Sequence, residues 1–134
     1  MVTPHTDLPD SNFQMTDKIV ILCTCPDAEE AGRLARSLVE ANLAACVNVI
    51  PQVRSYYRWK GAFETSEECL LAIKSSGQLF GALRAHIEQI HSYEVPEILA
   101  LPVEAGSQKY LNWLDANLLD AYLDVNPGSR PESV

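Results

Sequence analysis

Apolar residues recur along the chain with two different spacings, and these predict the order of its secondary-structure elements. Runs of apolar and β-branched residues predict strands, whereas apolar residues three and four positions apart predict amphipathic helices. We expect strands at 18–25, between Asn42 and Lys60, at 63–74 and at 95–103. Helices are expected at about 27–41, 79–90 and 107–114, the last of which could extend to Leu123. This order is that of a ferredoxin-like α+β fold, βαββαβ with an additional C-terminal helix, in which an antiparallel sheet packs two helices on one face.

Capping and turn residues support several of these boundaries. Asp27 can cap the first helix, and Glu30 three residues later completes a capping-box pattern. Lys60 and Gly61 stand between the second and third strands, and a glycine there supplies the positive φ of a tight hairpin turn. Pro51 lies inside the long second strand, so we expect a bend or bulge there, or an edge position.

Three of the expected strands are apolar at consecutive positions: residues 19–22, 70–73 and 98–101. A sheet that is covered by helices on one face only should instead alternate apolar and polar residues. An exposed apolar sheet face would exceed the patch size that soluble monomers tolerate, so something must cover the second face. We therefore expect a homo-oligomer, in which the long aromatic strand of a neighbouring subunit covers that face.

The chain of 134 residues is long enough for one domain with a core of its own. Both end segments are polar and contain prolines, so we expect a flexible tail at 1–16, a folded domain at 17–124 and a second tail at 125–134. A net charge of −8 and the lack of a Lys/Arg run argue against nucleic acid as a partner. No apolar run approaches the ~20 residues that span a bilayer, and no secretory signal begins the sequence, which predicts a cytoplasmic protein without membrane contacts.

Four motifs follow one another in the sequence: Leu-Cys-Thr-Cys-Pro-Asp at 22–27, the helix end and aromatic strand at 41–61, His-Ser-Tyr-Glu-Val-Pro-Glu at 91–97 and Tyr-Leu-Asn-Trp-Leu at 110–114. In this order, and from about Lys18 to about Leu118, the sequence resembles the CutA family. These are small trimeric proteins named for tolerance of divalent cations. The resemblance implies the ferredoxin-like fold derived above, a homotrimer, and an association with tolerance of divalent metal ions such as copper.

The motifs contain candidate metal ligands. Cys23 lies near the start of a helix, where the helix dipole favours a thiolate, and His91 and Glu97 lie after the second helix. Thiolate, imidazole and carboxylate together suit zinc or copper. The resemblance implies copper binding at Cys23 and a histidine ligand at the position of Ile90, so either His91 serves from a shifted position or the site is incomplete. All three ligands also have purely structural interpretations, as a packed thiol, a charge at a helix end and an acceptor for backbone amides.

Aromatic and basic residues form a second group of candidates. One interpretation is a small-anion site in a cleft between subunits, with an aromatic wall and basic side chains. The other is a subunit interface held by aromatic residues, with charges paired across it. The group comprises Tyr56, Tyr57, Arg58, Trp59, Lys74 and Tyr93.

These features predict a homotrimer associated with copper tolerance that binds metal weakly or conditionally and is not an enzyme, since the sequence has no phosphate loop, nucleophile elbow or His-Glu-x-x-His motif. Two alternatives involve no metal chemistry. One is a rigid trimeric scaffold for another protein. The other is a small-ligand sensor similar to the PII-like trimers, although the tight turn at 60–61 leaves no long signalling loop. A thiol enzyme using Cys23 and Cys25 would need a depressed thiol pKa and a nearby base.

Overall fold

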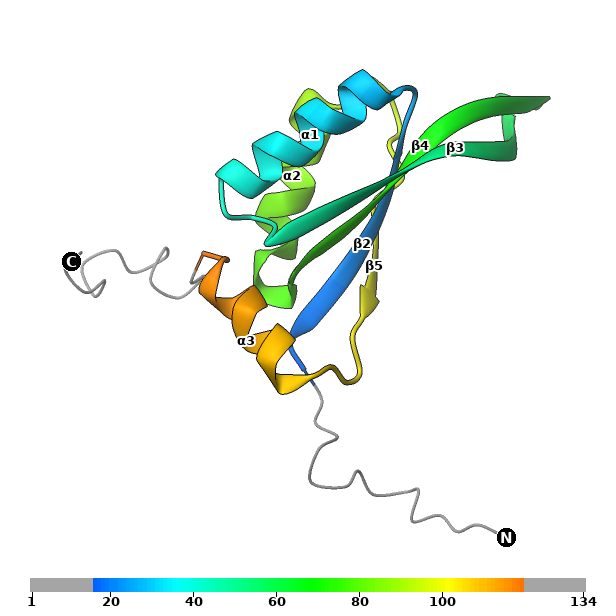
Figure 1. The fold of residues 1–134 in the computed structure, drawn as a ribbon. Coiled ribbons are helices and arrows are strands. Elements are labelled where there is room, and N and C mark those ends of the chain that lie inside the picture. The colour runs from blue at the N-terminus through cyan, green and yellow to red at the C-terminus, as the bar shows by residue number, and fades with distance from the viewer. Residues whose placement is uncertain (1–15, 120–134) are drawn as a thin grey trace, which may run out of the picture.

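The structure, a computed structural model, describes residues 16–119. These residues form four strands, three α-helices and one short 3-10 helix (Figure 1). In chain order the elements are β2 (Lys18–Cys25), α1 (Ala28–Glu40), β3 (Cys46–Trp59), β4 (Ala62–Ser76), the 3-10 helix η1 (Gly77–Leu79), α2 (Phe80–Ile90), β5 (Leu99–Pro102) and α3 (Gln108–Ala116). The tails expected at 1–16 and 125–134 lie almost wholly outside the described residues.

The four strands make one antiparallel sheet in the order β3-β4-β2-β5. The first and third strands of the chain are thus central, which is the split βαβ arrangement of a ferredoxin-like fold and confirms the predicted fold class. Figure 1 shows α1 and α2 together on one side of the sheet, with the paired ends of β3 and β4 projecting beyond the other strands. No helix within residues 16–119 is long and apolar enough to cross a membrane.

Local sequence signals have their expected structures. The Asp27 carboxylate accepts a hydrogen bond from the Glu30 amide at 2.8 Å and so caps α1. Lys60 and Gly61 have φ values of 50° and 83°, as a two-residue hairpin turn requires. The register of β3 against β4 shifts between Ile50 and Val53, so the bulge expected at Pro51 is present.

The last strand is shorter than predicted. Residues 95–98 do not join the sheet, and β5 pairs only with β2 over Leu99–Pro102. Pro96 has no amide hydrogen for a ladder, and the preceding amides of Ser92 and Tyr93 bond to side chains instead. The third helix ends at Ala116, close to the expected end at residue 114, and the possible extension to Leu123 lies largely outside the described residues.

The two faces of the sheet differ in how they are covered. Ile21, Cys23 and Cys25 alternate along β2 and, with Leu71 and Ile73 of β4, form the buried core beneath the helices. The intervening positions belong to the opposite face. Strand pairing aligns six apolar residues there, namely Val20, Leu22, Leu70, Ala72, Leu99 and Leu101. Neither α1 nor α2 lies on this face (Figure 1), and α3 contacts it at Lys18 and Lys74. The apolar second face expected from the sequence is therefore present.

Candidate metal centre

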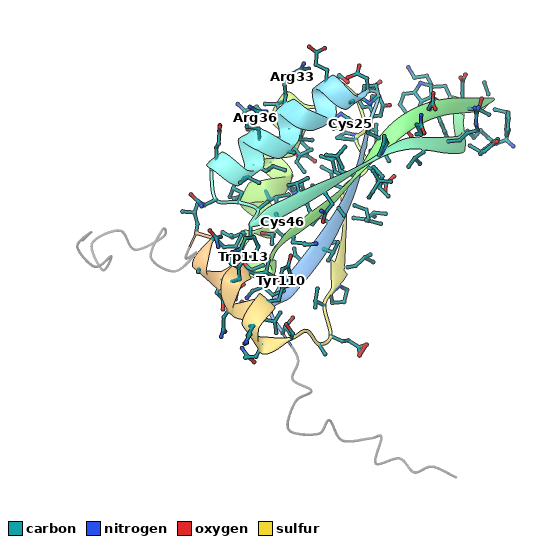
Figure 2. The ribbon with its side chains drawn as sticks, in the orientation of Figure 1. Cys25, Arg33, Arg36, Cys46, Tyr110 and Trp113 are labelled. Atoms are coloured by element: carbon teal, nitrogen blue, oxygen red, sulfur yellow. The ribbon has the colours of Figure 1, made fainter. Side chains whose placement is uncertain are left out.

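Two thiols and one imidazole converge where β2 meets the start of α1. Cys23 and Cys25 are two positions apart on one strand, so both point into the core. His91 directly follows α2, and its fully buried side chain lies beside them. The two sulfurs and an imidazole nitrogen all lie within 4.8 Å of one another, and Cys25 Sγ is 3.8 Å from His91 Nε2. Figure 2 shows the position of Cys25 at this end of the sheet.

Hydrogen bonds fix the tautomer of His91. Its Nε2 lies 2.8 Å from the Thr24 carbonyl oxygen, which can only accept, so Nε2 carries the proton. The Tyr93 amide donates to Nδ1 at 3.0 Å, so Nδ1 is an acceptor. The Glu30 carboxylate is 3.6 Å from Nδ1 and accepts from the Ser92 amide at 2.9 Å. His91 is thus held as a neutral imidazole between β2, α1 and the loop after α2.

The two thiols differ in acidity because they lie close together and each affects the other. The neighbouring Cys25 and burial together raise the pKa of the Cys23 thiol well above its usual range. The interaction with Cys23 lowers the pKa of the Cys25 thiol, although burial opposes that shift. Cys25 is therefore the thiol of the pair that loses its proton first.

The donor set suits a soft or borderline metal ion. Thiolate and imidazole are the ligands preferred by copper(I) and zinc, and the 3.8 Å separation of Cys25 Sγ and His91 Nε2 is compatible with bonds of about 2.0–2.3 Å to one shared ion. The cluster also imposes a cost. A metal at Nε2 would have to displace the Nε2 proton, which forms the hydrogen bond to the Thr24 carbonyl oxygen. The Cys23 thiol would also have to lose its proton. The three residues fit a metal, but they hold protons in its place.

The sequence-predicted ligands do not all meet in this cluster. Cys23 and His91 do, whereas Glu97 lies outside it and lines a neighbouring open cavity of about 660 Å3. The negative charge of Glu97 nevertheless contributes to the raised pKa of Cys23. Ile90, at the position where the resemblance implies a histidine, is 47% exposed at the end of α2.

The aromatic and basic candidates separate into two places. Tyr56, Tyr57, Trp59 and Tyr93 line the same cavity as Glu97. Arg58 does not line it. Lys74 lies near the other end of β4, paired with Cys46 and 5.7 Å from the centre of the Tyr110 ring. In Figure 2 Cys46 and Tyr110 lie together at that end, away from Cys25. Within one subunit, the two basic residues and the aromatic wall do not form an anion site.

Two participants were not assigned to the metal site from the sequence. Cys25 completes the cluster, and its position two residues from Cys23 on a strand was the available signal, because such residues share a face. Glu30 was expected to close a capping box, but its carboxylate instead reaches the loop after α2. No local pattern indicates that contact, which joins residues 62 positions apart.

Comparisons with known proteins agree on one family. A family model described as CutA1 divalent ion tolerance protein matches residues 19–117. The chain is 47% identical over 108 residues to a divalent-cation tolerance protein CutA of Pectobacterium atrosepticum, covering 81% of this chain and 98% of that protein. It is 48% identical over 91 residues to protein CutA of Mus musculus, covering 68% of this chain and 51% of that longer protein.

A solved structure agrees with these sequence matches. The crystal structure of CutA1 from Oryza sativa superposes with a TM-score of 0.76 at 42% identity, covering 79% of this chain and 97% of that one. A curated rice relative, of which this chain spans 59%, is named chloroplastic. Family membership therefore does not decide the cellular location, and a cytoplasmic location stays a prediction. The family match spans most of the chain, and the fold matches a solved member. The chain therefore belongs to the CutA1 divalent ion tolerance protein family.

Proposed function

We propose that this protein contributes to the tolerance of divalent metal ions, copper above all, by binding one soft metal ion per subunit weakly and conditionally within a homotrimer. The proposed ligands are Cys23, Cys25 and His91. Glu97 does not belong to the cluster, but its charge contributes to the raised pKa of Cys23. The family names support the association with metal tolerance, and the ligands are inferred from this chain's own residues.

One observation carries the proposal: two thiols and an imidazole meet in the core, within 4.8 Å of one another. Buried cysteines commonly act as small hydrophobic residues, and that role alone does not require a histidine between them. The neighbouring Glu30 carboxylate, 3.6 Å from His91 Nδ1, is placed to accept a hydrogen bond from Nδ1–H if His91 changes tautomer. This gives the imidazole a route to release Nε2 for a metal.

The same geometry explains why binding should be conditional. The entering ion must displace the Cys23 proton and break the bond from His91 to Thr24, and the cluster is closed off from solvent. Both costs lower the apparent affinity and make it rise with pH. Such a site responds when metal is abundant rather than holding an ion permanently.

An anaerobic titration of copper(I), and separately zinc, into reduced protein tests the proposal. Competition with a chromophoric chelator gives the affinity, and sulfur-to-copper charge-transfer absorption reports the ligands. We expect one ion per subunit, with an affinity at least about tenfold weaker in Cys25→Ala and in His91→Phe. The matched control is Cys46→Ser, a free and partly exposed cysteine at the other end of the sheet, which should bind as wild type does.

The result also separates the alternatives. Uptake that is not saturable, or that Cys25→Ala and Cys46→Ser reduce equally, would reject the cluster as a metal site. An intact trimer without a site would then support the rigid scaffold. Glu97→Gln distinguishes a ligand from a nearby charge, since a nearby charge changes the affinity only modestly and leaves the absorption bands in place.

A further inference from the structure

The cavity beside the thiol cluster has an unusual lining. Strand β3 supplies Tyr56, Tyr57 and Trp59, and the loop after α2 supplies Tyr93, Glu94 and Glu97. Glu68 of β4 completes the wall. At about 660 Å3 the cavity is the size of a small-molecule site and far larger than a bare ion requires. Its lining contains three carboxylates and no lysine or arginine among residues 16–119, although Lys60 Nζ lies 5.5 Å from the centre of the Trp59 ring.

Glu68 indicates which charge a ligand of this cavity should carry. Only 6% of its surface is exposed, yet no ion pair within the described chain neutralises it. One carboxylate oxygen accepts a hydrogen bond from the Tyr93 hydroxyl at 2.6 Å. The other oxygen has no partner among residues 16–119 and is not fully buried, so it can meet a molecule in the cavity. Burial, together with Glu68 itself, raises the pKa of Tyr93, so this phenol remains a donor. A largely buried carboxylate without a counter-charge favours a cation beside it, and a cation in the cavity would supply that charge.

The aromatic wall restricts what kind of cation fits. Tyr57 and Trp59 lie two positions apart on β3, so they belong to the same face of that strand. Aromatic faces attract amine and guanidinium groups through their ring electrons and bury the carbon atoms of a ligand. A hydrated metal ion would gain nothing from such a wall, and an anion would be repelled by the carboxylates.

We propose that this cavity binds a small organic cation, an alkylamine or alkylguanidine, with its charged group at Glu68 and its carbon chain against Tyr57 and Trp59. The site does not need the metal. It adjoins the thiol cluster, since Thr24 and Tyr93 line the cavity and also bond to His91. An occupant would therefore contact both residues that fix the His91 tautomer.

Calorimetric titration of the metal-free, reduced full-length protein with n-butylguanidinium tests this proposal, with neutral n-butylurea as the ligand of matched shape. We expect saturable binding of the guanidinium and at least about tenfold weaker binding of the urea. The Trp59 indole proton signal should shift on binding. Glu68→Gln should weaken guanidinium binding at least about tenfold, with subunit mass and melting behaviour recorded to verify that the variant folds.

The control variant is Glu64→Gln, which removes the same charge from an exposed position on β4 outside the cavity lining. It should leave the affinity unchanged. If Glu64→Gln and Glu68→Gln weaken guanidinium binding equally, the effect is one of overall charge and the proposal is wrong. Equal affinities for guanidinium and urea would also overturn it. A basic side chain of a second subunit could present the same chemistry. If such a side chain fills the cavity, the oligomer should not bind guanidinium, whereas a dissociated variant should bind it. That result would overturn the proposal of a free ligand.

Discussion

Glu30 connects the beginning of α1 to the loop that follows α2. Its carboxylate, 10% exposed, accepts from the Ser92 amide and lies close to His91. The next residue back, Glu29, has a side chain that is 85% exposed and makes only a long contact of 3.8 Å with Arg33. Two adjacent glutamates of one helix therefore have different roles, and the difference comes from burial and partners rather than from residue type.

Glu30→Ala should destabilise the protein by about 1–3 kcal/mol, because it removes a charged acceptor from the partly buried hydrogen bond of the Ser92 amide. Urea unfolding at a fixed protein concentration measures this change. The amide of Ser92 should also exchange its hydrogen faster. Glu29→Ala should change the free energy of unfolding by no more than about 0.5 kcal/mol. Equal effects of the two substitutions would mean that the loss reflects helix propensity or the helix dipole instead.

At single residues, sequence reasoning succeeded where the cause is local and missed where it is not. Asp27 caps its own helix, and Gly61 takes the positive φ of its own turn, so neighbouring residues contain all the information. The roles of Cys25 and Glu68 depend on partners distant in sequence: Cys25 contacts His91, and Glu68 contacts Tyr93. The strand pattern indicated where Cys25 points, but not what it meets.

Among the elements, α3 is held to the sheet by a small number of contacts. Leu114 is its buried apolar residue, and Asp115 pairs with Lys18 of β2 at 2.6 Å. Lys18 also pairs with Asp17, and its side chain is only 4% exposed. Burial opposes its charge, but hydrogen bonds to the two aspartates together raise the pKa of Lys18. The hydrogen bond to Lys18 in turn lowers the pKa of Asp17.

Lys18→Met should reduce stability by about 1 kcal/mol at neutral pH, since both aspartates are partly exposed and remain hydrated without the lysine. The difference from wild type should shrink in acid. Asp17 has a folded pKa below its ordinary value of 3.8, so the pair contributes fully above that pH and is lost as the pH falls through the lower value. Unfolding curves of both proteins from neutral pH to about pH 3 measure this dependence.

The exposed pair Arg84–Glu88 supplies the control for that measurement. Glu88→Gln removes an ion pair of comparable length, 2.7 Å, in which both side chains are almost half exposed. It should change stability much less than Lys18→Met does. A constant difference between wild type and Lys18→Met at every pH would show that the methionine acts through packing rather than through charge.

Elements were predictable to the extent that their ends are marked by local chemistry. The hairpin of β3 and β4, the bulge after Pro51 and the start of α1 were all expected from single residues. The start of β5 was not, because no residue between Val95 and Leu99 gives a clear strand start. The preceding loop instead bonds to Glu30 and His91, which lie far away or outside the strand.

For the whole molecule, the apolar face opposite α1 and α2 is the feature that predicts an assembly. Leu99 and Leu101 are 57% and 49% exposed on this face and continue the row of Val20 and Leu22. An uncovered face of this kind favours association, and burial at about 25 cal/mol per Å2 would stabilise the product. The homotrimer stays a prediction on these grounds.

Leu101→Glu should therefore lower the particle mass, because a charge buried in the contact between subunits is unfavourable. Light scattering of the wild-type protein should give three times the subunit mass. Val39→Glu, on α1 and 40% exposed, adds the same charge on the helix side and should leave the mass unchanged. A wild-type particle of single-subunit mass would contradict the predicted assembly.

The order of the strands also has a consequence for chain entropy. From one edge of the sheet to the other, each pairing joins segments further apart in sequence: a two-residue turn connects β3 to β4, Cys25 pairs with Cys69, and Leu22 pairs with Leu99. Closing a longer loop costs more, by about 0.6 kcal/mol for each doubling of its length. The shortest strand, β5, thus closes the longest loop with the fewest ladder bonds. The sheet is most easily opened at this edge, where the loop that holds His91 and Glu97 enters it.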